Sequence, residues 1–143
     1  MLEVEVFGAE LAPGAPLPQE VRRLCALATT AAGVQDGHLA IEYVDERRIV
    51  QLNAEHRGKD GPTDVLSFPI DGAVGHGGGV ERELGDVVIC PAHTSDLREA
   101  IVHGVLHLVG FDHETDDGEM LALQAELLAD RKSRGSPIAE EGR

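Results

Sequence analysis

The feature that most constrains this chain is segment 103–113, which reads HGVLHLVGFDH. Its apolar residues predict a buried helix, and His103 and His107 lie one turn apart on one face of that helix. Gly110 allows the helix to end sharply, so that the chain can fold back and carry His113 toward the other two histidines. Any fold of this chain must therefore allow His113, in the loop after the buried helix, to approach His103 and His107 on that helix.

Three imidazoles that converge are the ligand set of a catalytic zinc ion, which leaves its fourth position to water. The spacing HxxxHxxGxxH is that of the long zinc-protease motif, but the position of the peptidase's general base, directly after the first histidine, is Gly104. A lone histidine on an apolar helix face is more often a core or capping residue. Three at this spacing predict one Zn²⁺ per chain, bound by His103, His107 and His113.

The rest of the chain predicts a small α+β domain, with a mixed sheet of about four strands packed with about four helices. Its length of 143 residues fits one domain, which we expect over residues 1–131, followed by a disordered tail over residues 132–143. Five glycines in segment 72–79 indicate a flexible hairpin connection. Strands are expected over 2–7, 38–44, 65–70 and 84–90. Helices are expected over 21 to about 33, from a cap at Asp45 through residue 52, over 99–109 and over 120–128.

Composition excludes several classes of protein. A formal net charge of −14 argues against general nucleic-acid coating, since such affinity comes from Lys and Arg releasing phosphate counterions. This net charge does not exclude a nuclease whose few basic residues gather at one site. No apolar run approaches the roughly 20 residues that span a bilayer, and no signal peptide is visible. Cys25 and Cys90 lack a disulfide pattern and are expected to be small buried hydrophobes of a cytoplasmic protein.

A second informative stretch comprises Arg57 and segment 62–69, which reads PTDVLSFP. We expect Arg57 on a turn-rich loop over 57–62. Beside a metal, its planar guanidinium could stabilise charge on phosphate oxygens, or pair with a carboxyl substrate. The alternative is a surface arginine paired with Glu55 or Asp60.

Several polar residues near these motifs have open roles. Thr63 and Asp64 could cap a turn, or could orient a ligand histidine through its second N–H. Asp112 could play the same orienting role, and Glu114 is a candidate acid or base beside the metal. The remaining histidines of this part of the chain lack ligand spacing and are expected to be non-ligands: His56, His76 and His93.

Three segments in order, NAEHRGKDGPTDVLSFPI (53–70), LGDVVICP (84–91) and HGVLHLVGFDH (103–113), closely resemble the YbeY family of bacterial ribosomal RNA maturation factors. The resemblance extends from about Ile41 to Leu128. It implies a single-strand-specific, metal-dependent endoribonuclease that matures the 3′ end of 16S ribosomal RNA and acts in ribosome quality control. Its zinc ligands would be the three histidines, and Arg57 its functional arginine.

The resemblance also implies partners and shows local departures. Single-stranded RNA, the 16S precursor above all, and the ribosome or its proteins are the expected partners, with no membrane and no DNA. His56 stands where the family usually has an aromatic residue, and Phe111 where it has tyrosine. The stretch between Pro91 and His103 is shorter than expected for the family.

The resulting hypothesis is metal-assisted phosphodiester cleavage, with zinc polarising a phosphate oxygen or activating water and Arg57 holding the phosphate. The sequence does not identify a general base. One alternative is another metallohydrolase, such as a peptidase that takes its base from Glu114; Gly104 weighs against it. The other alternative is a ribosome assembly or interaction factor with structural zinc. Structural zinc usually has four protein ligands, often including cysteine, so three histidines without a nearby cysteine favour an open, catalytic site instead.

Overall fold

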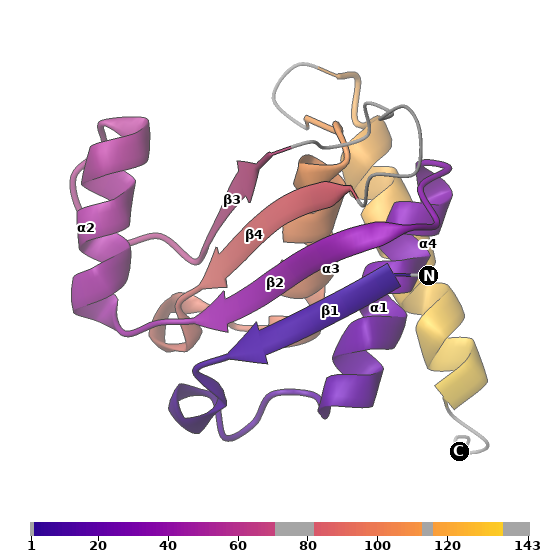
Figure 1. Cartoon of the computed structure of the whole chain (residues 1–143), viewed down its shortest axis with the longest axis horizontal. Coiled ribbons are helices and arrows are strands. Elements are labelled where there is room, and N and C mark those ends of the chain that lie inside the picture. The colour runs from indigo at the N-terminus through magenta and orange to yellow at the C-terminus, as the bar shows by residue number, and fades with distance from the viewer. Residues whose placement is uncertain (1, 71–81, 113–115, 136–143) are drawn as a thin grey trace.

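The computed structural model describes residues 2–70, 82–112 and 116–135 of the chain. None of the helices within these ranges is long and apolar enough to cross a bilayer. The elements follow one another as β1 (Leu2–Phe7), α1 (Pro18–Ala31), β2 (Gly37–Tyr43), α2 (Glu46–Arg57), β3 (Val65–Pro69), β4 (Glu83–Ile89), α3 (Leu97–Leu108) and α4 (Glu119–Gly135), with short 3₁₀ turns at Ala9–Leu11 and Pro91–His93 (Figure 1).

The strands form one mixed sheet in the order β1-β2-β4-β3. β1 pairs parallel with β2 and β2 parallel with β4, whereas the edge strand β3 pairs antiparallel with β4. This confirms the predicted α+β class and each predicted strand to within about one residue. The predicted hairpin connection over residues 72–79 lies outside the described residues.

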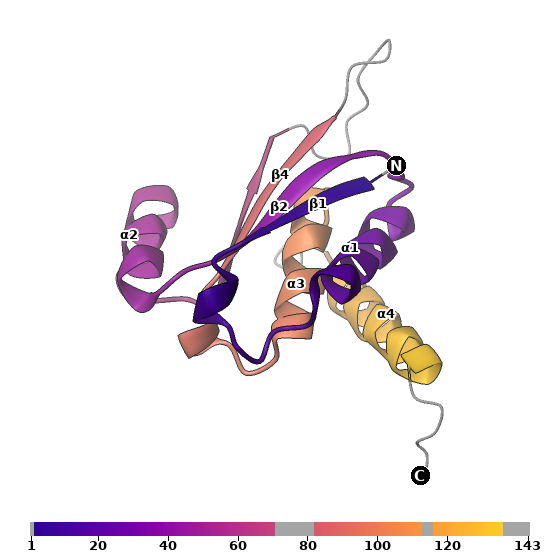
Figure 2. The same ribbon diagram turned by 60° about the horizontal axis from the view of Figure 1, so that its bottom comes forward.

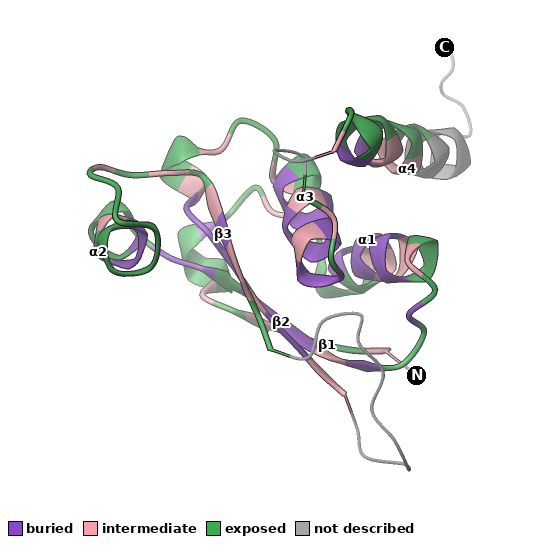
Figure 3. Cartoon of the chain, turned by 90° about the horizontal axis from the view of Figure 1, so that it is seen from above, coloured by how far each residue is buried: buried purple, intermediate pink, exposed green. Residues whose placement is uncertain are grey.

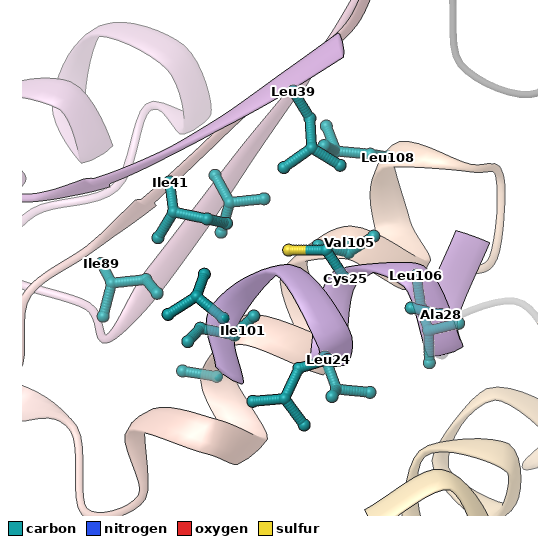
Figure 4. Close-up of a cluster of buried hydrophobic side chains, with 14 of the residues drawn as sticks. Leu24, Cys25, Ala28, Leu39, Ile41, Ile89, Ile101, Val105, Leu106 and Leu108 are labelled. Carbon is teal, nitrogen blue, oxygen red and sulfur yellow. The ribbon is translucent and has the colours of Figure 1, made fainter. Parts of the chain in front are cut away.

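Helices cover the two faces of the sheet unequally. α1 and α3 pack against one face, with α4 beyond them, and α2 stands alone on the other face beside β3 and β4 (Figure 2). The larger core lies between α1, α3 and the sheet, and the close-up shows side chains from all three, among them Leu24, Leu39 and Ile101 (Figure 4). α3 is buried along nearly its whole length, whereas α2 exposes its outer side (Figure 3). The predicted histidine helix is thus the central helix of the domain.

Local capping explains where α2 begins and ends. Asp45 accepts a hydrogen bond from the Arg48 backbone N–H at 2.9 Å, which satisfies one of the free donors of the first turn as predicted. The helix then runs to Arg57, past the expected end at residue 52, and stops at Gly58 in the left-handed conformation. The expectation of a short helix, with Arg57 on a loop, was therefore wrong. The apolar pattern ends early, but the polar residues that follow still form helix.

α4 also extends further than predicted. It runs to Gly135, so residues 132–135 are helical and not part of a disordered tail. Lys132 and Arg134, two of these four residues, have high helix propensity and are favourable near a helix C-terminus. Residues 136–143 of the predicted tail lie outside the described residues.

Candidate functional site

α3 presents both of its histidines on one partly buried face. His103 and His107 are only partly covered, while their helix neighbours are buried against the sheet and α1. The helix ends in a Schellman motif: the Phe111 N–H donates to Leu106 O at 3.0 Å and the Gly110 N–H to His107 O at 3.1 Å. Gly110 has a φ of 107°, which glycine adopts without strain. The sharp helix end predicted at Gly110 is confirmed.

The two rings lie close enough to share a ligand. Their centroids are 4.8 Å apart, with 73° between the ring planes. His103 Nδ1 lies 2.8 Å from Oε1 of Gln124 on α4. Because an amide oxygen only accepts, Nδ1 carries a proton, and the neutral form of this ring has its lone pair on Nε2. A neutral imidazole that donates a hydrogen bond from one nitrogen and has its lone pair on the other is the form that binds zinc, so His103 fits such an ion.

The third predicted ligand, His113, lies outside the described residues. Among the residues that are described, no three His, Cys, Asp or Glu side chains gather at one point. Both cysteines are buried and free of disulfides, as predicted, and burial raises the pKa of each thiol. A raised pKa disfavours the thiolate that a metal would require. The three-histidine set therefore stays a prediction, supported by the two members that the structure places.

Gly104 has a packing reason to be glycine. A Cβ built at this position would lie 2.4 Å from Cγ1 of Val87 on β4 and 3.3 Å from Cγ2 of Val65 on β3. The Ser67 hydroxyl on β3 also donates to Gly104 O at 2.9 Å. Position 104 thus faces the sheet at very short range. A peptidase-type glutamate at this position would collide with Val87, which accounts for the missing base.

Arg57 lies on the same groove as the histidines. A groove of about 970 Å³ is lined by the end of α2, by β3 and the residues before it, and by the end of α3, so that Arg57, His103 and His107 share its walls. Within the described residues Arg57 forms no ion pair with Glu55 or Asp60. The ion pairs found there join His38 to Glu5 and Glu83, and His93 to Glu46. The alternative of a paired surface arginine is not supported. Arg57 is exposed, and its guanidinium is accessible to a ligand.

The other polar candidates divide clearly. Asp64 Oδ1 accepts from the Val65 N–H at 2.8 Å and from Thr63 Oγ1 at 3.4 Å, which is local turn chemistry. Asp112 lines the groove and is exposed, while Glu114 lies outside the described residues.

Two of the remaining histidines can be placed. His93 Nε2 pairs with Glu46 Oε2 at 2.7 Å, and His56 makes an edge-to-face contact with Phe68, with centroids 4.7 Å apart. His56 and Phe68 both line the groove. His76 lies outside the described residues.

Two features of the site have no local signature in the sequence. Gln124 lies on the second turn of an amphipathic helix whose pattern only predicts packing, yet it contacts His103. The contact between His56 and Phe68 joins α2 to β3. Both depend on how elements pack, and neither follows from spacing along the chain.

Comparison with known proteins agrees with this architecture. Residues 14–132 match the family described as Endoribonuclease YbeY. The protein called Endoribonuclease YbeY in Salinispora tropica is 41% identical over 124 residues, which cover 71% of this chain and 79% of the relative. That of Rubrobacter xylanophilus is 39% identical over 132 residues, 87% and 93% of the two chains. A solution structure from Thermotoga maritima shares the fold, with a TM-score of 0.54, 24% identity and coverage of 98% and 99%.

Proposed function

This chain belongs to the endoribonuclease YbeY family, and we propose that it is a metal-dependent endoribonuclease that cleaves single-stranded RNA. The observation that carries the proposal is the groove that joins Arg57 at the end of α2 with His103 and His107 on α3. During cleavage of a phosphodiester, negative charge develops on its nonbridging oxygens. A guanidinium beside a metal site can stabilise that charge.

His103, His107 and His113 would hold the metal, with zinc as the expected ion. When bound, zinc supplies Lewis acidity to a phosphate oxygen or lowers the pKa of a bound water toward about 7. Gln124 Oε1 lies 2.8 Å from Nδ1 of His103, so Nε2 is the nitrogen that would bind the ion. Arg57 binds the phosphate through its planar fork of donors and orients the phosphodiester along the groove.

The groove suits a flexible single strand better than a duplex. The aromatic side chains of His56, Phe68 and Phe111 line it, and unstacked bases could stack on the faces of such rings. The chain has a net charge of −14, so binding of RNA depends on local cations and not on a general basic surface. Arg57 and the metal would provide that local charge.

The physiological substrate that we propose is the 3′ end of the 16S ribosomal RNA precursor, in the context of the ribosome and its proteins. This proposal rests on family membership, and it assigns the protein a cytoplasmic role in ribosomal RNA processing and ribosome quality control. The packing of Gly104 against Val87 disfavours the peptidase alternative, since it leaves no room for the base beside the first ligand.

The test is cleavage of a labelled single-stranded RNA that carries the 16S 3′ end. We expect the zinc-loaded wild type to cut, and His107→Ala and Arg57→Ala to lose activity by at least tenfold. The matched controls are His93→Ala and Arg47→Ala, exposed or partly exposed residues outside the groove, which should cut normally.

Three outcomes would contradict the proposal. Wild-type activity that survives removal of metal by a chelator would refute the metal dependence. Equal activity of Arg57→Ala and Arg47→Ala would refute the role of Arg57. Failure of the zinc-loaded wild type to cut either free RNA or RNA within the small subunit would favour an assembly factor with structural zinc.

A further inference from the structure

Gln124 is a buried polar residue that the mechanism above does not require to touch substrate. Its side chain is only 7% exposed, and it reaches from α4 to His103 on α3 with an Oε1–Nδ1 distance of 2.8 Å. Burying an amide costs free energy unless it is hydrogen-bonded. The other contacts between α3 and α4 in this core are made by apolar residues. A leucine or methionine would fill this position with less cost if packing were its purpose.

The direction of this hydrogen bond determines that Nδ1 of His103 carries a proton. The amide oxygen can only accept, so Nδ1 must donate, and in the neutral ring the lone pair is then on Nε2. Without a fixed partner a neutral imidazole exchanges its proton between the two nitrogens, and one of the two forms presents N–H where a metal needs a lone pair.

α4 is anchored in a way that holds Gln124 in place. Asp116 Oδ2 accepts from the Met120 N–H at 2.9 Å, which caps the first turn of the helix. Met120 itself is fully buried in the core between the helices. Gln124 follows one turn later on the same helix face. The hydrogen bond to His103 therefore comes from an element with a fixed position.

We propose that Gln124 is a positioning residue that locks the tautomer and the ring orientation of His103 for metal binding. The inference rests on the proposed metal site and deepens it. Partners of ligand histidines typically change metal affinity about 10- to 100-fold when they are removed. A carboxylate at the same position would keep the acceptor and make the imidazole a more basic ligand.

The experiment compares Gln124→Met, which keeps length but removes the acceptor, with Gln124→Glu, which keeps the acceptor. Gln19→Met is the matched control, because Gln19 is exposed on α1 far from the groove. The first readout is the ¹⁵N shifts of the His103 ring in metal-free protein at about pH 8, above the usual range of imidazole protonation. The second is the zinc dissociation constant, measured by competition with a chromophoric chelator.

We expect wild type, Gln124→Glu and Gln19→Met to show the proton on Nδ1. Gln124→Met should show a mixture of tautomers and bind zinc about 10- to 100-fold more weakly, while Gln124→Glu binds at least as tightly as wild type. If Gln124 only fastened α4 to α3, its replacement would lower the stability of the protein but would change neither the His103 tautomer nor the zinc affinity. Thermal unfolding of each metal-free variant is therefore measured as well.

Two different results would refute the role of Gln124 and the metal site itself. If Gln124→Met keeps the wild-type tautomer and the wild-type zinc affinity, the role of Gln124 is refuted while the metal site stands. If wild type binds zinc no better than His107→Ala, the metal site itself is refuted, and the inference with it.

Discussion

Replacing Gly104 by alanine tests whether close packing reserves this position for glycine. In an unhindered helix interior, Gly→Ala stabilises a protein by about 0.8–1.0 kcal/mol, because alanine has the higher helix propensity. In α3 the new Cβ would lie 2.4 Å from Cγ1 and 3.1 Å from Cγ2 of Val87. We expect the steric cost of this close contact to cancel or exceed that gain.

The magnitude follows from the distances. Carbon atoms in contact prefer a separation of about 3.5–4.0 Å, so α3 or Val87 must move by roughly 1 Å or more. Val87 is fully buried and cannot turn into solvent. Overpacking of this kind costs about 1–3 kcal/mol. After subtraction of the propensity gain, we expect a net loss of about 0–2 kcal/mol in the free energy of unfolding.

The assay is urea unfolding of metal-free protein for a double-mutant cycle of Gly104→Ala and Val87→Ala. Val87→Ala removes two buried methyl groups and should cost about 1.6 kcal/mol from burial alone, with a further cost for the cavity. The alanine at position 104 then occupies part of that cavity. The double variant should be more stable than the sum of the single effects by about 1–3 kcal/mol.

Two results would refute this reasoning. One is a Gly104→Ala protein that is more stable than wild type by about 1 kcal/mol, as at an open helix position. The other is additivity of the two substitutions within about 0.5 kcal/mol, which would mean that the two side chains do not meet. Either result would also remove the packing argument against a peptidase base at this position.

Two further predictions concern local contacts. His38 bonds Glu83 Oε2 through Nδ1 and Glu5 Oε1 through Nε2, both at 2.8 Å, and the hydrogen bond to Glu83 above all raises its pKa above 6.5. The stabilisation is therefore full below about pH 6.5 and lost as the pH rises through the raised pKa, so the deficit of His38→Gln in urea unfolding should shrink from pH 6 to 9. Asp45→Ala, which removes the N-cap of α2, should cost about 0.5–2 kcal/mol by thermal unfolding, with Asp60→Ala as the neutral control; equal losses would contradict the capping role.

The sequence alone determined the features that depend on nearest neighbours along the chain. Alternation of apolar residues predicted the first two strands, and Asp45 as a capping residue predicted the start of α2. Gly110 predicted the end of α3, because a left-handed residue is needed there and glycine adopts it without strain. The positions of His103 and His107 on one face of α3 follow from helical periodicity. These features are encoded in backbone hydrogen bonds between residues a few positions apart.

Only the tertiary structure decided which residues meet at the site. The partner of His103 is Gln124, 21 residues away, and the hydroxyl that bonds Gly104 belongs to Ser67, 37 residues away. Arg57 reaches the groove because α2 continues past its apolar stripe and stands beside β3 on the opposite face of the sheet from α3. Such contacts depend on how helices pack on the sheet, and that packing is set by shape and burial over the whole core, which no short pattern contains.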